Sequence, residues 1–482
     1  MKRSLLMILL LLSFSLPASA KQPNILFCMA DDWGWPHAGA YGDPVVKTPT
    51  FDRLAREGIL FEHAYVSSPS CTPSRGAILT GQWHWRLEGA GNLWSVFPDK
   101  FTTYEDLISQ AGYATGHSGK AWGPGRPETK ERQLAGKRYK SFQQFLAEKE
   151  SDQPFCYWLG SSDPHRPYKA GSGAASGMKI EDVPLPACYP DSDVIRSDIA
   201  DYYFEVQRFD SLVGKAIQSL EENGQLENTL ILMTGDHGMP FPRCKSNLYD
   251  IGTRVPLAIR WGDKIKPGRV VTDFVSTTDF APTFLEAAGL PIPAEMTGRS
   301  LMPLFNSDRS GRVQKNWNSI LVGKERHVPS QEAPDMGGYP SRGLRNDDYF
   351  LIVNFKPDRW PNGTPDYQKA ALPGTWYGDT DNGPTKTYII ANMDRDSEHR
   401  RAYELCFGKR PEVELYDLSM DPQQVENVAD HPDYEKVRRE LVAELMARLK
   451  ESGDPRVIDS DIDFDSYPYL GGGPKHPDAG KK

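Results

Sequence analysis

The sequence carries no excess of positive charge. Its 482 residues include 56 Lys and Arg against 65 Asp and Glu, which gives a net charge of −9 at pH 7. Such a surface does not attract nucleic acid or another extended polyanion as a whole, so we expect no nucleic-acid partner. A small anionic ligand would have to meet a local basic pocket within an acidic body. With 39% hydrophobic residues, the chain can still build a sizeable core.

Long hydrophobic runs are absent after residue 16, so no later segment is expected to cross a membrane. The one apolar run, Leu5 to Leu16, follows Met1-Lys2-Arg3 and precedes Ala18-Ser19-Ala20. A charged start, a short apolar stretch and an Ala-x-Ala site predict a secretory signal peptide over residues 1–20. We therefore expect a mature chain that begins at Lys21, without a membrane anchor after cleavage. The short Sec-type signal favours a bacterial protein that is periplasmic or secreted.

Cysteines are few and scattered. The six stand at positions 28, 71, 156, 188, 244 and 406. An exported chain could pair six cysteines in three disulfides. However, the spacing forms no framework, and a chain of this length needs no covalent staples. Cys28 and Cys156 lie in apolar, strand-like runs, so we expect them to be buried free thiols.

Two apolar runs end in residues that bind metals. Residues 23–30 lead into Asp31-Asp32, and residues 230–235 lead into Asp236-His237. A continuous apolar run predicts a parallel strand buried on both faces, and open α/β sheets place their sites at the C-terminal ends of such strands. Adjacent carboxylates repel each other unless a cation neutralises them, so these ends predict a metal site. The alternative is a pair of turns whose acids cap helices.

The most informative stretch is Ser70-Cys71-Thr72-Pro73-Ser74-Arg75, which continues to Thr80-Gly81. Pro73 suits the first turn of a helix, so Cys71 is expected at a helix N-terminus, where the dipole favours negative charge. Arg75 follows one turn later, on the same face. The stretch predicts a nucleophile and a cation that face an oxyanion. The alternative for Cys71 is a small buried hydrophobe.

The pattern Cys-x-Pro-Ser-Arg with a following Thr-Gly resembles the signature of the type I sulfatases, in the alkaline phosphatase superfamily. Other blocks of that family follow in the same order over almost all of the mature chain. The resemblance implies that a formylglycine-generating maturation enzyme oxidises Cys71 to formylglycine, whose hydrated aldehyde is the nucleophile. It also implies a divalent ion, Ca²⁺ with Mg²⁺ as the alternative. The implied metal ligands are Asp31, Asp32, Cys71, Asp236 and His237. Because Ca²⁺ prefers oxygen ligands, His237 leaves the identity of the ion open and keeps a transition metal among the alternatives.

Three more blocks supply candidate catalytic residues through the same resemblance. Lys120 matches a lysine that contacts the sulfate, but Trp122 stands where the family has a histidine, and His117 could replace that imidazole. His165 matches the histidine that protonates the leaving group. Lys245 matches a second basic residue on the sulfate. The implied catalytic set is Cys71, Arg75, Lys120, His165 and Lys245.

The α/β pattern weakens after about residue 325. We expect residues 21–335 to form an α/β catalytic domain, with a large mixed, mostly parallel sheet sandwiched by helices. Residues 336–482 are expected to form a smaller C-terminal domain with an antiparallel sheet and a terminal helix. The polar tail from Gly471 is expected to be mobile. His327 and Arg342 are predicted to recognise sugar hydroxyls or a carboxylate over the mouth of the site, with ordinary loop charges as the alternative.

Together these residues imply a hydrolase that releases inorganic sulfate from a sulfated carbohydrate, either a glycosaminoglycan or an algal polysaccharide oligosaccharide. Asp163-Pro164-His165-Arg166 and Tyr339-Pro340-x-Arg342 resemble the heparan N-sulfatase-like branch, so N-sulfoglucosamine is an alternative substrate. A phosphoester or phosphonate hydrolase of the same superfamily is a second alternative. A glycan-binding protein without catalysis is a third, for which Trp122 and His237 are the only hints.

Overall fold

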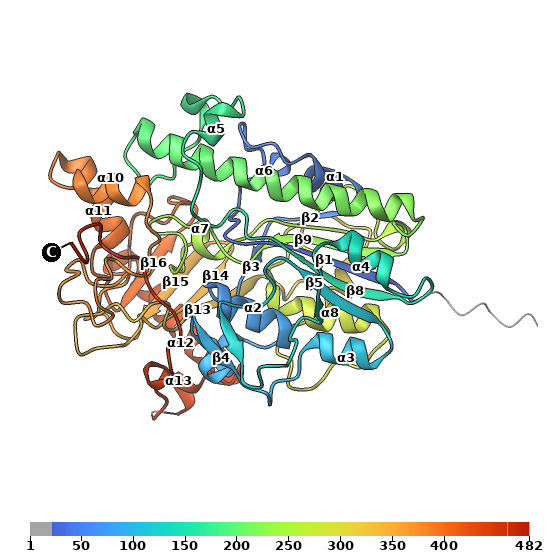
Figure 1. The fold of residues 1–482 in the computed structure, drawn as a ribbon. Helices are drawn as coiled ribbons and strands as arrows, with labels where there is room; N and C mark the ends of the chain where they lie inside the picture. The colour runs from blue at the N-terminus through green and yellow to red at the C-terminus, as the bar shows by residue number, and fades with distance from the viewer. Residues whose placement is uncertain (1–21, 460, 482) are drawn as a thin grey trace, which may run out of the picture.

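The computed structural model describes residues 22–459 and 461–481. The predicted signal peptide, residues 1–20, lies outside the described residues. Among the helices of the described part, none combines the length and the apolar character that crossing a bilayer requires. Two sheets organise the chain (Figure 1).

The larger sheet has eight strands in the order β11-β2-β10-β9-β1-β8-β5-β7. β1 pairs in parallel with β9 and β8, and β8 pairs in parallel with β5, whereas β10 runs antiparallel to β9 and β2. The strands are β1 (Asn24–Ala30), β2 (Ile59–Phe61), β5 (Ala114–Ser118), β7 (Lys137–Arg138), β8 (Phe155–Gly160), β9 (Thr229–Gly235), β10 (Leu257–Arg260) and β11 (Arg269–Val271). The prediction of a large mixed, mostly parallel sheet is confirmed.

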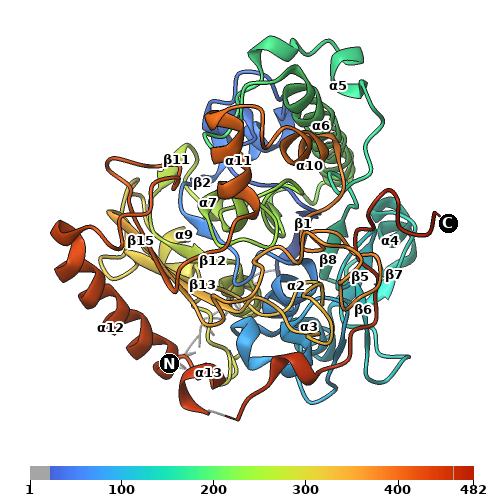
Figure 2. The same cartoon turned by 90° about the vertical axis from the view of Figure 1, so that its left-hand side faces the viewer.

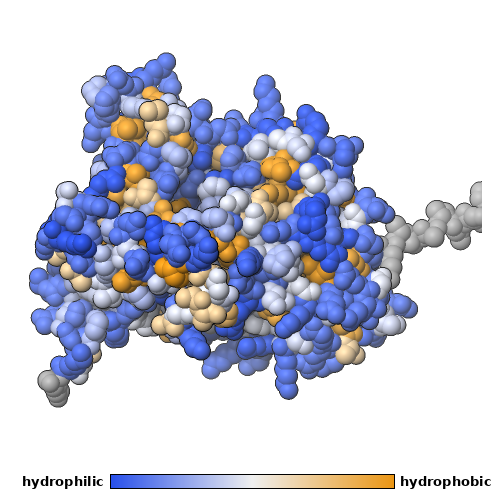
Figure 3. All heavy atoms as spheres, turned by 90° about the horizontal axis from the view of Figure 1, so that it is seen from above, coloured by the Kyte–Doolittle hydropathy of each residue, from blue (hydrophilic) through white to orange (hydrophobic). Residues whose placement is uncertain are grey.

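Helices cover both faces of this sheet (Figure 1). One face packs against α1 (Pro49–Glu57), α4 (Phe142–Glu148) and the long α6 (Asp193–Glu222), and the other against α2 (Cys71–Thr80), α3 (Tyr104–Gln110) and α8 (Phe280–Ala287). Successive side chains of β1 point to opposite faces of the sheet. Leu26 and Cys28 pack in the core on the α6 side, and Phe27 packs in the core on the α8 side. The outer side of the molecule over α5 (Ser172–Ala175) and α6 is largely hydrophilic, with small separate apolar patches (Figure 3).

The smaller sheet is antiparallel, in the order β13-β14-β15-β16. Its strands are β13 (Ser319–Lys324), β14 (Ser341–Asn346), β15 (Tyr349–Asn354) and β16 (Val413–Asp417). Helix α12 (Glu435–Glu451) lies alongside this sheet (Figure 2). Its Leu441, Leu445 and Leu449 share a core with Leu344 and Leu351 of the sheet. The C-terminal antiparallel sheet and terminal helix are therefore confirmed. The division into two domains, residues 21–335 and 336–482, stays a proposal. Because β13 precedes residue 336, the small sheet takes its first strand from the first of these two segments.

Short elements complete the chain. They are β3 (Ala64–Tyr65), β4 (Ser95–Phe97), β6 (Gly125–Pro127), β12 (Val275–Ser276), α7 (Asp250–Thr253), α9 (Met302–Phe305), α10 (Pro384–Ala391), α11 (Ser397–Phe407) and α13 (Pro455–Ile458). All six cysteines are buried and free, as predicted for Cys28 and Cys156.

The C-terminal tail differs from the expectation of a mobile end. Residues 467–481 run back across the molecule and are hydrogen-bonded to two loops, so that the Leu470 amide donates to Trp94 O at 2.8 Å and the Trp376 amide to Pro474 O at 3.0 Å. The tail is polar because it exposes one side to water, while its backbone is held by groups from distant segments. Composition alone could not reveal those partners.

Candidate active site

Four neighbouring parallel strands deliver side chains to one edge of the large sheet. In the order β9, β1, β8 and β5, their C-terminal ends are followed by Asp236-His237, Asp31-Asp32, His165 and Lys120. Because parallel strands end at the same edge, residues separated by up to about two hundred positions in sequence meet there. The strand-end acids predicted from sequence do lie together.

Cys71 is the first residue of the fully buried helix α2. Its Sγ lies 3.7 Å from Asp31 Oδ1 and 3.3 Å from His237 Nε2, and the side chain is almost inaccessible to solvent. Ser70 does not cap the helix with its side chain, because its Oγ lies 2.8 Å from His327 Nδ1. The N-terminus of α2, where the helix dipole favours negative charge, thus lies next to Asp31 and His237.

The metal-type side chains after β1 and β9 form a buried cluster, in which each residue is 0–2% exposed: Asp31, Asp32, Asp236 and His237. His237 Nε2 lies 3.2 Å from Asp32 Oδ1 and 3.7 Å from Asp236 Oδ1. Asp32 has φ of 73°, a left-handed conformation that non-glycine residues rarely adopt, and its buried Oδ1 accepts no hydrogen bond. An orphaned carboxylate oxygen beside an imidazole nitrogen and a second carboxylate is a donor set that fits a divalent cation.

Two lysines neutralise these acids. Lys120 Nζ lies 2.6 and 2.7 Å from the two oxygens of Asp31, and Lys245 Nζ lies 3.0 Å from Asp32 Oδ2. Burial opposes ionisation of Asp31, but the charges of Lys120 and Arg75 outweigh it and hold the pKa of the Asp31 carboxyl well below its usual range. Burial likewise opposes the charge on Lys245, yet Asp32 and Asp381 raise the pKa of that ammonium well above its ordinary value. Burial also opposes the charge on Lys120, but Asp31 raises the pKa of its ammonium, so both cations keep their charge at neutral pH.

The position of Arg75 differs from the one that we expected from the sequence, in which its guanidinium faces the reacting anion. Its guanidinium is fully buried: Nε donates to Asp236 Oδ2 at 2.8 Å, and one Nη donates to the carbonyls of Lys120 and Ala121 at 2.9 and 2.6 Å. The other Nη lies 3.3 Å from Asp31 Oδ1. Arg75 does not line the cavity beside Cys71. We infer that it holds Asp31 and Asp236 in place rather than touching the reacting anion.

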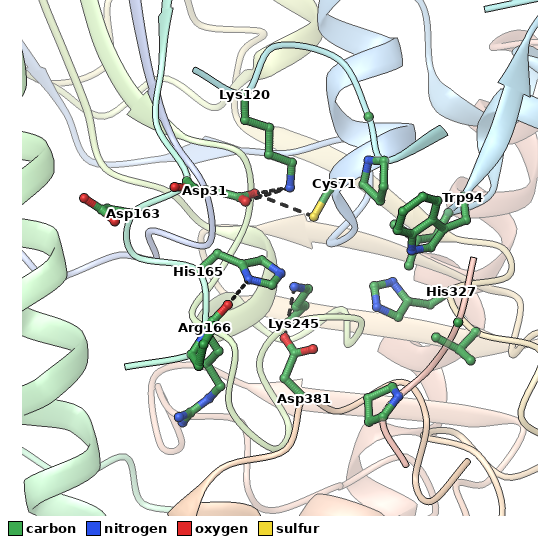
Figure 4. A pocket seen from close by; sticks show the side chains of 18 of the residues that line it. Asp31, Cys71, Trp94, Lys120, Asp163, His165, Arg166, Lys245, His327 and Asp381 are labelled. Carbon is green, nitrogen blue, oxygen red and sulfur yellow. Dashed lines mark hydrogen bonds and ion pairs between the residues drawn. The ribbon is translucent and has the colours of Figure 1, made fainter. Parts of the chain in front are cut away.

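A cavity of about 710 Å³ opens beside these groups (Figure 4). From the predicted set it is lined by Asp31, Cys71, Lys120, His165, Lys245 and His327. His165 Nδ1 lies 2.6 Å from the carbonyl of Arg166, so this nitrogen carries the proton and Nε2 is left for the cavity. In Figure 4, the side chains of Lys120, His165 and Lys245 converge from different loops on the space beside Cys71.

The two residues proposed to recognise sugar have different surroundings. His327 lines the cavity, and burial lowers the pKa of its imidazole to about 3, so it is neutral at physiological pH. Arg342 is fully buried, with Asp454 and Glu325 each 2.6 Å from its guanidinium, and it does not line the cavity. The proposal that Arg342 binds substrate is therefore withdrawn, because its donors serve an ion-pair network beneath β14.

Trp122 lines the cavity where the family resemblance led us to expect histidine, and its ring packs edge-on against Phe97. His117 does not take that place: it is not among the residues that line this cavity, and its Nδ1 lies 3.1 Å from the carbonyl of Gly136. Sequence reasoning also missed Asp381, whose Oδ2 lies 3.0 Å from Lys245 Nζ. Asp381 sits in a polar loop without a strand end or motif to mark it.

Comparison with known proteins adds independent findings. The profile of the family described as "Sulfatase" matches residues 23–290, and that described as "N-sulphoglucosamine sulphohydrolase, C-terminal" matches residues 235–360. Human N-sulphoglucosamine sulphohydrolase is 29% identical, over 92% of this chain and 93% of its own. An ulvan-active sulfatase of Formosa agariphila is 28% identical, over 91% and 82%.

Solved structures share the fold. A protein solved in complex with its substrate D-glucosamine-2-N,6-O-disulfate superposes with a TM-score of 0.64 at 20% identity, over 92% of this chain and 100% of that one. The phosphonate monoester hydrolase of Agrobacterium radiobacter gives a TM-score of 0.64 at 17% identity, over 89% and 96%.

Proposed function

We propose that this chain, which belongs to the sulfatase family and is therefore a hydrolase of sulfuric esters, acts on a sulfated saccharide. The names of its relatives support a saccharide, since one acts on N-sulphoglucosamine and another on ulvan. The cavity supports it too, because its walls carry four carboxylates, two ammonium groups, two guanidinium groups and two imidazoles, which together can bind hydroxyl and sulfate oxygens.

One observation carries the assignment of the site. The N-terminus of α2 holds Cys71 Sγ 3.7 Å from Asp31 Oδ1, and the ammonium groups of Lys120 and Lys245 border the same cavity. Here Sγ stands in for the oxygen that residue 71 bears once oxidised to formylglycine, a change that supplies a hydrated aldehyde as nucleophile. We assign that oxidation to a formylglycine-generating maturation enzyme, and export through the predicted signal peptide to the periplasm or medium.

A divalent ion is part of the proposal, with Ca²⁺ or Mg²⁺ as the candidates. The residues that would hold it are Asp31, Asp32, Asp236, His237 and the oxidised residue 71. Donor atoms of Asp32, Cys71 and His237 lie within 4.8 Å of one another, as do those of Asp31, Cys71 and Asp236, and Asp32 Oδ1 is left without a hydrogen bond. When bound, such an ion polarises a sulfate oxygen and lowers the pKa of a bound hydroxyl.

The other side chains supply charge and a proton. Lys120 and Lys245 present positive charge to the sulfuryl oxygens, where negative charge increases in the transition state. Their pairing with Asp31 and Asp32 keeps both ammonium groups fixed before substrate enters. As an imidazolium, His165 keeps one proton on Nδ1, which donates to the carbonyl of Arg166, and gives the other, on Nε2, to the leaving oxygen or nitrogen of the sugar.

The role of His165 predicts a dependence on the leaving group. His165→Gln is expected to slow sulfate release from a saccharide by about 10²- to 10⁴-fold. With 4-nitrophenyl sulfate, whose leaving group needs no proton, the same variant should lose less than about fivefold. Initial rates on both substrates measure this. His117→Gln, a change outside the cavity lining, is the control and should affect neither rate. Equal losses on both substrates would contradict the assignment of His165 as general acid.

If the site binds a divalent ion, chelation should lower both the rate of sulfate release and the thermal stability of the protein. Removing divalent ions should lower kcat/KM for sulfate release by at least about 100-fold. Restoring the ion at about 100 times its Kd should add about 2.7 kcal/mol of stability, seen as a rise in Tm. Calorimetry with Ca²⁺, Mg²⁺ and Mn²⁺ in turn identifies the ion. In the Asp236→Asn control the Tm should not respond. A metal-free enzyme, verified by elemental analysis, that keeps full activity would disprove the site.

The nature of the sugar is a narrower proposal. N-Sulfoglucosamine is the favoured candidate, because the profile "N-sulphoglucosamine sulphohydrolase, C-terminal" matches residues 235–360 and the human enzyme aligns over nearly the whole chain. Liberated sulfate is to be measured against N-sulfo-glucosamine, O-sulfated glycosaminoglycan and sulfated algal galactan oligosaccharides. Paired 4-nitrophenyl sulfate and phosphate rates test the phosphoester alternative. Absence of sulfate release from every saccharide, with a folded and matured enzyme, would refute the saccharide proposal.

A further inference from the structure

A second cavity, of about 770 Å³, adjoins the one that holds Cys71. The segment between β5 and α4, from residue 119 to residue 138, forms most of its wall. Lys120, Trp122 and Ser162 line both cavities, so the two are direct neighbours. We call this second cavity the basic groove.

The lining of the basic groove carries charge of one sign. Its cationic side chains are Lys120, Lys130, Arg132 and Arg138, and no aspartate or glutamate of the described residues lines it. Burial lowers the pKa of His117, which also lines the groove, so that imidazole adds no charge. In the whole chain the proportion is reversed, with 65 acids against 56 Lys and Arg. The groove is therefore a local region of positive potential on an acidic protein.

Two of the four cations have partners and two do not. Lys120 belongs to the ion pairs of the candidate active site, and a guanidinium nitrogen of Arg132 lies 2.8 Å from Asp106 Oδ2. Lys130 and Arg138 are exposed, and neither side chain forms an ion pair or a hydrogen bond with any residue of the described part of the chain. The charges of Lys130 and Arg138 are thus available to a ligand.

Position in the sheet explains one of these two cations but not the other. Arg138 belongs to β7, at the edge of the large sheet, where a charged side chain can prevent pairing with a second sheet. Lys130 lies in a turn before that strand, so this explanation does not extend to it. An anionic ligand would account for both, because the two side chains line the same cavity.

We propose that the basic groove binds an anionic saccharide, whose sulfate or carboxylate groups pair with Lys130 and Arg138. The proposal rests on the proposed function for the class of ligand, and extends it to anionic groups other than the one that reacts. Cys71 and the acids of the metal-type cluster do not line the groove, so an anion bound there is held and not hydrolysed. The volume is in the range of small-molecule sites, and the indole of Trp122 in the shared wall is a surface on which a sugar ring can pack.

Titration calorimetry with a heparin hexasaccharide tests the groove. Every protein is the full chain with Cys71→Ala, so that no sulfate is released during the titration. In about 50 mM NaCl, Lys130→Ala and Arg138→Ala should each raise the Kd about threefold, and the two together about tenfold. The effect of the double variant should shrink in about 500 mM NaCl, because salt screens exposed charges. Lys179→Ala removes an exposed charge outside both cavities and is the matched control, which should leave the Kd within about 1.5-fold.

Inhibition of the mature enzyme shows whether one saccharide occupies both cavities. If the hexasaccharide competes with 4-nitrophenyl sulfate, and the double variant weakens this inhibition about tenfold, a single molecule reaches both. If the hexasaccharide binds without competing, a separate molecule occupies the groove. Either result supports the groove as a saccharide site.

Three results would overturn the proposal. The first is an unchanged Kd in the double variant, with circular dichroism and Tm showing that it folds. The second is an equal loss of affinity in Lys179→Ala. The third is a hexaglutamate peptide that binds as tightly as the hexasaccharide, which would point to an acidic peptide as the ligand. The proposed function is measured separately, by sulfate release from 4-nitrophenyl sulfate and from the saccharide panel above, and it would fail only if no sulfate were released.

Discussion

Replacing Cys71 with alanine is expected to lower kcat for sulfate release by about 10⁴-fold or more, because the variant has no group at the end of α2 that can attack sulfur. The unmodified thiol is itself a poor nucleophile here, since burial raises the pKa of Cys71 well above its ordinary value and thiolate is scarce at neutral pH. Activity should therefore follow the oxidised fraction of residue 71. In mass spectra the peptide that contains it should be roughly 18 Da lighter than the thiol form.

Cys156→Ala provides the control for this variant. Cys156 is equally buried but lies in β8 within the core, away from the cavity. We expect it to cost about 1 kcal/mol of stability and no more than about twofold in rate. Sulfate release that survives in Cys71→Ala, or full activity in a preparation whose residue-71 peptide has the thiol mass throughout, would contradict the proposed nucleophile.

Arg75→Lys is expected to remove most activity without removing the charge. Lysine cannot reproduce the fork that binds Asp236, Asp31 and two backbone carbonyls at once, so the carboxylates would lose their fixed positions. Loss of part of this buried network should cost about 3–5 kcal/mol of stability. Misplacement of the metal ligands should lower kcat/KM by about 100-fold. Denaturant unfolding and initial rates measure the two effects separately.

Arg342→Lys separates the two effects, because Arg342 is also fully buried and bound by two carboxylates but lies outside the cavity. It should lose a similar amount of stability while the rate per folded molecule stays within about twofold of wild type. If Arg75→Lys behaved in the same way, Arg75 would be a stabilising residue of the fold with no part in positioning the site.

Much of the site could be predicted from residues next to regular structure. Asp31-Asp32 and Asp236-His237 follow strands whose apolar sequence marks them as central, and neighbouring parallel strands necessarily end at one edge. Pro73 and the helical run after it likewise placed Cys71 at a helix start. These features are local in sequence, so their geometry follows from the secondary structure.

The remainder depends on contacts that sequence spacing does not encode. Arg342 was expected in a loop over the mouth of the site, yet it lies in β14 and its guanidinium pairs with Asp454, 112 residues later in sequence. Asp381 and the C-terminal tail, residues 467–481, belong to irregular segments, whose path is decided by hydrogen bonds to distant backbone groups. No periodicity or capping motif marks such partners.

Lys245 links the two halves of the chain through a single ammonium group. Its Nζ lies 3.0 Å from Asp32, at the end of the first strand, and 3.0 Å from Asp381, in the loop before α10. A truncated protein that stopped before this loop would leave the buried ammonium of Lys245 with only one of these two carboxylate partners. The chemistry at one end of the large sheet therefore cannot be transplanted without the carboxyl-terminal part, which makes this enzyme a poor donor for domain exchange.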